Sequence, residues 1–73
     1  MEHFERITFD KNIMGGRACI RGMRIPVSVI VNQIAHGASF DEVLKEYPDL
    51  EEADIKEALG YAGWLAQEQV EVS

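Results

Sequence analysis

The 73-residue sequence has one cysteine, Cys19, and only two histidines, His3 and His36, which lie far apart. A single cysteine cannot form an intramolecular disulfide and is typical of a protein kept in a reducing compartment. Neither histidine has a second ligand at metal-binding spacing, and Cys19 has neither a second thiol nor an evident catalytic base beside it. The sequence therefore predicts no catalytic residue, no metal site and no cofactor.

Long hydrophobic runs are also missing. The longest have three residues, as at residues 29–31, whereas a membrane-spanning helix needs about 20. The N-terminal stretch MEHFERITFD lacks the apolar segment of a signal peptide. The glycine-rich stretch GGRACIRG (residues 15–22) fits neither common phosphate-binding pattern. We therefore expect a cytoplasmic protein that is not an enzyme and does not associate with a membrane.

Hydrophobic residues are nevertheless abundant, at 47% of the chain, which is typical of a folded protein rather than a disordered one. A chain of this length forms one small domain with a limited core. We expect a single domain over residues 1–73. We also expect a homodimer, in which a second copy covers apolar surface that one copy leaves exposed.

Charge is unevenly distributed along the chain, whose net charge is −6. Residues 1–37 hold five basic residues and three acids, a net charge of +2. Residues 38–73 hold two basic residues and ten acids, a net charge of −8. This asymmetry indicates either two surfaces for different partners or acids that only keep the helices soluble.

The N-terminal part, residues 1–26, predicts a short β-ribbon with tight turns. RITF (residues 6–9) and RACI (residues 17–20) alternate polar and apolar residues, as strands do. Gly15 and Gly16 suit the turn between these strands, and Gly22 suits a second turn. Pro26 keeps Ile25 extended.

After Pro26 the hydrophobic period becomes helical, and residues 27–68 predict three helices. The first spans about residues 27–36 and ends near Gly37. Ser39 and Glu42 form a capping box that begins the second helix, and Pro48 ends it. The third lies within residues 49–69. The predicted fold class is mainly α: a short N-terminal β-ribbon followed by a three-helix bundle of helix-turn-helix type.

Three arginines, Arg17, Arg21 and Arg24, lie close together in the ribbon. If RACI is a strand, Arg17, Cys19 and Arg21 share one face, separate from the apolar face. Guanidinium groups bind carboxylates and phosphates, so the three arginines are predicted to contact a protein partner or nucleic acid. The alternative is structural: the arginines pair with acids of the second and third helices and hold the ribbon on the bundle.

Two aromatic residues, Tyr61 and Trp64, lie beside the apolar stripe of the third helix, next to Gly60 and Gly63. Small residues allow helices to approach closely, and aromatic side chains supply contact area. Tyr61 and Trp64 are therefore predicted either to complete the core or to form a self-association surface.

The order of these motifs resembles the bacterial domain-of-unknown-function 433 family from Ile7 to about Ala62. The segments in register are Gly15-Gly16, Ile20-Arg21-Gly22, Arg24-Ile25-Pro26-Val27, Gly37, Ser39, Tyr47-Pro48-Asp49-Leu50 and Ala58-Leu59-Gly60-Tyr61-Ala62. The chain departs from the family pattern at Lys11 and Ala18, where prolines are common, and at Met23 and Glu51, where threonines are usual. These departures loosen the N-terminal turns and weaken the cap of the third helix.

The resemblance implies a homeodomain-like, winged-helix-related trihelical fold and the role of a VapB-type antitoxin. Such a protein binds and silences a PIN-like ribonuclease toxin, with operator DNA as a second partner. Two contacts stay open: the acidic half imitates RNA phosphates, or Arg17, Arg21 and Arg24 pair with metal-binding carboxylates of the toxin. The alternative function is a helix-turn-helix DNA-binding regulator without a toxin. Against DNA, the third helix begins with four acids and one lysine, which should repel phosphates.

Overall fold

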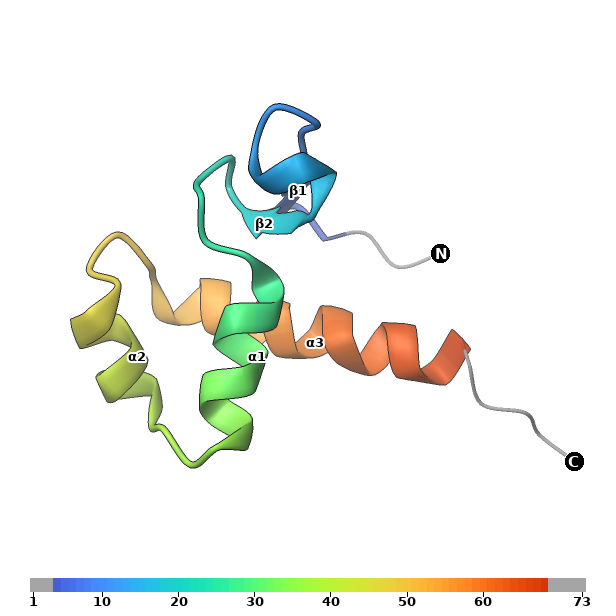
Figure 1. The fold of residues 1–73 in the computed structure, drawn as a ribbon. Helices are drawn as coiled ribbons and strands as arrows, with labels where there is room; N and C mark the ends of the chain where they lie inside the picture. The colour runs from blue at the N-terminus through green and yellow to red at the C-terminus, as the bar shows by residue number, and fades with distance from the viewer. Residues whose placement is uncertain (1–3, 69–73) are drawn as a thin grey trace, which may run out of the picture.

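The computed structural model describes residues 4–68, where a two-stranded ribbon precedes three helices (Figure 1). The elements are β1 (Ile7–Phe9), the 3₁₀ turn η1 (Met14–Gly16), β2 (Ala18–Ile20), α1 (Val27–Ala35), α2 (Phe40–Glu46) and α3 (Glu52–Glu68). The predicted fold class, a mainly α protein with a short N-terminal ribbon, is confirmed. Only η1 has no counterpart among the elements that the sequence predicts.

The ribbon contains two reversals of the chain. β1 and β2 pair antiparallel, with Ile7 opposite Ile20. A second turn follows β2, where the N–H of Met23 donates to the carbonyl of Ile20 at 2.8 Å. Arg21 and Gly22 both have positive φ, 45° and 72°, as the central residues of a type I′ turn do. Glycine adopts this conformation freely, whereas at Arg21 it is strained.

The prediction that β2 separates an arginine face from an apolar face is wrong. Cys19 and Ile20 are neighbours in the strand, yet their side chains are 1% and 0% exposed. The turn at Arg21 brings residues 25–26 back beside β2, and the backbone of Cys19 forms an antiparallel β-bridge with that of Pro26. β2 is therefore flanked on both edges and covered more completely than an edge strand. Arg21 does not continue the alternation, because its backbone is left-handed.

The helix ends follow local sequence signals. The hydroxyl of Ser39 accepts the N–H of Glu42 at 3.1 Å, and the Glu42 carboxylate accepts the N–H of Ser39 at 2.8 Å, so the predicted capping box is confirmed. Gly37, with φ of 99°, ends α1. The N–H of Ala38 donates to the carbonyl of Gln33 at 3.0 Å, which is the six-to-one hydrogen bond of a Schellman motif.

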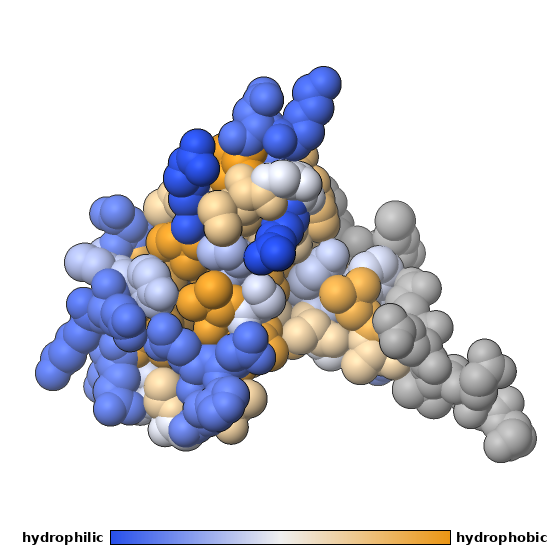
Figure 2. Space-filling model, in the orientation of Figure 1, coloured by the Kyte–Doolittle hydropathy of each residue, from blue (hydrophilic) through white to orange (hydrophobic). Residues whose placement is uncertain are grey.

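The core forms where α1 and α2 pack on the first half of α3 beneath the ribbon. Its buried side chains are Ile7, Ile20, Val27, Ile30, Val43, Leu50, Ile55 and Ala58. The antiparallel strands β1 and β2 and the turn between them are called the hairpin (residues 7–20). In Figure 2, hydrophilic side chains gather over the hairpin and α2, and hydrophobic side chains reach the surface between them. No helix within residues 4–68 is long and apolar enough to span a bilayer.

Candidate functional site

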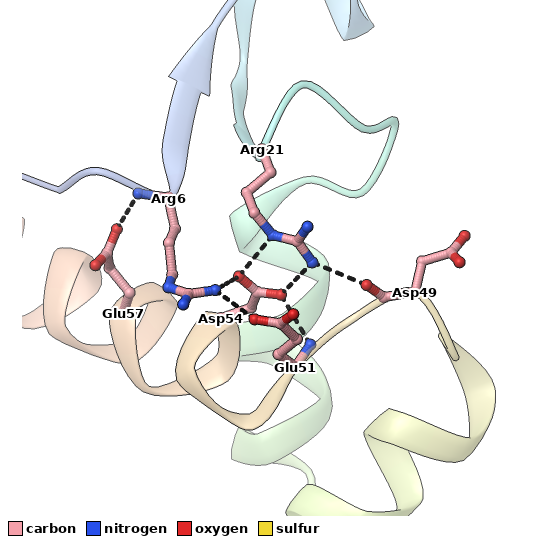
Figure 3. A network of polar contacts seen from close by, with 6 residues as sticks. All are labelled: Arg6, Arg21, Asp49, Glu51, Asp54 and Glu57. Carbon is pink, nitrogen blue, oxygen red and sulfur yellow. Dashed lines mark hydrogen bonds and ion pairs between the residues drawn. The ribbon is translucent and has the colours of Figure 1, made fainter.

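Two arginines at the base of the hairpin converge on one carboxylate of α3 (Figure 3). Arg6 precedes β1 and Arg21 follows β2, and the N–H of Arg21 donates to the carbonyl of Arg6 at 2.8 Å. Arg21 binds Asp54 with a fork: Nε donates to Oδ1 at 3.1 Å and Nη2 to Oδ2 at 2.8 Å. Nη1 of Arg6 donates to Oδ1 of Asp54 at 2.9 Å.

The carboxylate of Asp54 is fully buried, with 0% of the residue exposed. It accepts a fourth hydrogen bond from the N–H of Glu51, at 2.8 Å to Oδ2. Four donors occupy the acceptor sites of an ionised carboxylate. Burial by itself would raise the pKa of Asp54, but the hydrogen bonds from Arg21, from the Glu51 N–H and from Arg6 outweigh it. The pKa of Asp54 is therefore lowered, and the side chain is ionised at neutral pH.

Arg6, Arg21 and Asp54 form an ion-pair cluster. Further contacts extend this cluster along the start of α3. Nη1 of Arg6 also contacts Oε1 of Glu51 at 2.8 Å, and the backbone N–H of Arg6 donates to the carboxylate of Glu57. Nη2 of Arg21 donates to the carbonyl of Asp49 at 2.9 Å. Hydrogen bonds to Glu51 and Asp54 raise the pKa of Arg6, and the hydrogen bond to Asp54 raises that of Arg21. The cluster thus ties both strands of the hairpin to α3.

The structure gives the three predicted arginines different surroundings. Arg21 takes the structural alternative, because it pairs with Asp54 of α3. Arg17 and Arg24 are exposed, and within residues 4–68 neither belongs to an ion pair. Partner binding by Arg17 and Arg24 stays a prediction. Arg6, which no sequence motif singles out, is the second cation of the cluster.

The sequence suggests that the acids at the start of α3 form one acidic surface, but in the structure they do not. Asp54 is buried, and Glu57 is half-buried beside Arg6. Glu51 and Glu52 each keep 62% of the side chain exposed. The role of Asp54 could have been inferred from its position three residues after Glu51. From there a carboxylate can accept the backbone N–H of the residue that precedes the helix. Asp54 thereby supplies one half of a capping box, in which the third helical residue accepts the N–H of the residue before the helix.

Tyr61 and Trp64 contact aromatic side chains of the N-terminal segment. The ring centroids of Phe4 and Tyr61 lie 5.3 Å apart in an edge-to-face arrangement, and those of Phe4 and Trp64 lie 6.0 Å apart. Phe9 and Tyr61 are 6.1 Å apart. These contacts attach the N-terminal segment to α3. Self-association through Tyr61 and Trp64 stays a prediction.

An apolar groove of about 490 Å³ lies between the hairpin, α1 and the second half of α3. Its lining includes Phe9, Arg17, Val27, Val31, Ala62 and Leu65. Phe9 and Leu65 are 61% and 38% exposed and are large apolar residues. Arg17 is the one charged residue among the lining residues within the described part of the chain. The groove is thus an apolar surface with a cation at its margin.

The described residues contain no candidate metal centre, since no three His, Cys, Asp or Glu side chains gather there closely enough to hold an ion. Cys19 is buried. Within residues 4–68, the buried polar side-chain atoms, those of Asp54 among them, all have hydrogen-bond partners. The groove is the feature with exposed large apolar side chains at its lining.

The fold and these two features define a small helical domain whose β-ribbon is held in place by ion pairs to one buried carboxylate. The sequence profile of the family described as "Protein of unknown function (DUF433)" matches residues 7–62. The chain belongs to this family, so the resemblance found in the sequence is confirmed at the level of the family.

Two relatives illustrate the match. The chain is 34% identical over 58 residues to the uncharacterized protein y4eO of Sinorhizobium fredii, a match that covers 80% of this chain and 26% of that protein. It is 33% identical to a DUF433 member protein from Anabaena variabilis of known crystal structure, with a TM-score of 0.78. That match covers 86% of this chain and 62% of the other. This chain therefore spans about a quarter of the curated relative and less than two thirds of the solved one.

Proposed function

We propose that this domain is an antitoxin-like, non-catalytic module that binds and neutralises a PIN-like ribonuclease. The observation that carries the proposal is the apolar groove, where Phe9 and Leu65 stay exposed beside Arg17. A contiguous apolar surface on a small domain marks a contact site for another protein. An apolar centre with an arginine at its edge has the composition typical of protein interfaces.

The ion-pair cluster supports the same proposal, because it keeps the groove in shape. The hairpin supplies Phe9 and Arg17, and Arg6 and Arg21 attach that hairpin to buried Asp54. A surface that is ordered before binding loses less conformational entropy when the partner arrives. The hairpin therefore presents its side of the groove as a fixed wall.

The class of partner comes from the family resemblance, which points to PIN-like ribonucleases encoded beside VapB-type antitoxins. Exposed Arg17 supports contact between this chain and carboxylates of the toxin, one of the two arrangements that the sequence leaves open. The DNA-binding alternative has less support, because Glu51 and Glu52 are exposed at the start of α3 and would face phosphates there.

The proposal is tested with the reading frame next to this chain's gene, which we expect to encode a PIN-like ribonuclease. Cleavage of a fluorescent RNA by the purified ribonuclease should stop when the chain is added at equimolar concentration. Coexpression should likewise restore growth to cells that produce the ribonuclease. Cleavage that continues in the presence of a tenfold excess of the chain would contradict the proposal.

A further inference from the structure

We infer that the apolar groove binds one amphipathic helix of a partner protein, with apolar side chains seated in the groove and a carboxylate opposite Arg17. The inference rests on the proposed function, because it describes how the proposed partner is held. It assigns the groove an occupant of stated shape and charge.

The uncovered part of α3 shows that the groove lacks a packing partner. The helix continues past α1 (Figure 1), and its apolar stripe continues with it. Ile55 and Ala58, in the first half of the stripe, are 0% exposed. Ala62 is half-buried, and Leu65 is 38% exposed. The stripe that closes the core in its first half is thus open to solvent one or two turns later.

The walls of the groove fit a helix. Ser28 and Val31 lie three residues apart on α1, and Ala62 and Leu65 lie three apart on α3. Side chains at these spacings form ridges and grooves into which a further helix packs. An amphipathic helix laid into an apolar groove is a common mode of recognition between proteins. A helix in this position would extend the bundle by one member.

The charge of the lining favours a foreign helix over a second copy of this chain. A symmetric dimer centred on the groove would place each lining residue in the interface twice. Two copies of Arg17 would then enter one apolar interface, and no acid lines the groove in the part of the chain described to pair with either of them. Like charges placed together in this way oppose association. A helix that carries Asp or Glu meets Arg17 with the opposite charge.

The inference is tested by titrating the full chain with two designed 16-residue helical peptides. Both carry leucines at i, i+4 and i+7, and they differ in having Glu or Lys at the positions flanking the leucines. Binding is measured by fluorescence anisotropy, and the site by amide shifts in ¹⁵N spectra. We expect the Glu peptide to shift the amides of Ala18, Val31 and Leu65. The Lys peptide should bind roughly three- to tenfold more weakly.

Three variants locate the contact. Leu65→Glu should weaken binding of the Glu peptide by at least about tenfold, as loss of a central apolar contact does. Arg17→Glu should reverse the preference, so that the Lys peptide binds more tightly. Lys11→Glu is the matched control, because it makes the same charge change in the hairpin at an exposed residue outside the groove lining. It should leave the preference for the Glu peptide unchanged.

Several outcomes would overturn the inference. Equal binding of the two peptides, or an equal effect of Arg17→Glu and Lys11→Glu, would show that Arg17 does not select a carboxylate. A wild-type dimer in sedimentation that Leu65→Glu dissociates would assign the groove to a second copy. If the Leu65→Glu and Arg17→Glu variants both neutralise the ribonuclease fully, the groove is excluded as the contact site, while the proposed function stands. By contrast, failure of the wild-type chain to neutralise the ribonuclease, with the peptide preference intact, would contradict the proposed function and support helix binding by the groove.

Discussion

The two halves of α3 carry one continuous apolar stripe but have different surroundings. In the first half, Ile55 and Ala58 are covered by the other helices, and Asp54 is held by two arginines from the hairpin. In the second half, Leu65 lies at the edge of an open groove. The first half is therefore part of the core, and the second half leaves an apolar side chain exposed beside the groove.

This difference shows that periodicity alone does not distinguish a core position from an exposed one. Both halves repeat apolar residues at helical spacing, and both are expected to be buried if the sequence is considered by itself. The distinction arises because α3 is longer than the helices that pack against it (Figure 1). Substitutions in the two halves should therefore have different consequences for stability.

The largest effect is expected for Ile55→Ala, in the covered half. Ile55 is 0% exposed within the core, and truncating such a side chain costs about 2–5 kcal/mol of unfolding free energy. A chain of this length has a total of roughly 4–11 kcal/mol, so the variant should lose a large share of its stability. Urea denaturation followed by circular dichroism measures the change. Ile55→Val, the control, should cost only about 0.5–1.5 kcal/mol.

A somewhat smaller effect is expected for Asp54→Ala. The substitution removes the buried carboxylate and with it four hydrogen bonds, while Arg6 and Arg21 can return to water because their side chains are 33% and 36% exposed. We expect a loss of about 2–4 kcal/mol, or roughly 10–25 °C in Tm. Arg21→Ala should lower Tm by less, because Arg6 still neutralises Asp54. A Tm for Asp54→Ala within a few degrees of wild type would show that the cluster does not hold the hairpin.

The pH dependence of stability should report the same cluster. The folded-state pKa of Asp54 lies below its unfolded value, which is about 3.9. Its contribution is therefore fully present above that value and is lost as pH falls through the folded pKa, because the unfolded chain binds the proton more readily. Tm measured from pH 6 to pH 2.5 should fall more steeply for wild type than for Asp54→Asn. Parallel curves for the two proteins would contradict the assignment.

The elements that the sequence predicts well are those set by local signals. The capping box of Ser39 and Glu42 and the glycine that ends α1 act within one turn of helix, so both are visible in a short stretch of chain. The helical stripes follow from period alone. These signals are sufficient for the mainly α fold, and the order of motifs is sufficient for the family.

The candidate site was less predictable because its contacts join distant residues. Arg6 and Asp54 are separated by 48 positions, and nothing near either one indicates the other. The face assignment of β2 failed because the reversal at Arg21, a strained left-handed residue, brings Pro26 back alongside Cys19. The groove depends on the length by which α3 exceeds its neighbours, which is a property of the packed molecule.

The smallest effect is expected for Leu65→Ala, in the open half of the helix. Because Leu65 keeps 38% of its surface exposed, its truncation should cost less than about 1 kcal/mol. The variant should thus unfold near the wild-type temperature while losing affinity for the helical peptide. Measurement beside Ile55→Ala, at two protein concentrations, makes the contrast direct. If Leu65→Ala instead destabilises as strongly as Ile55→Ala, and Tm rises with protein concentration, then association of two copies buries this half of α3.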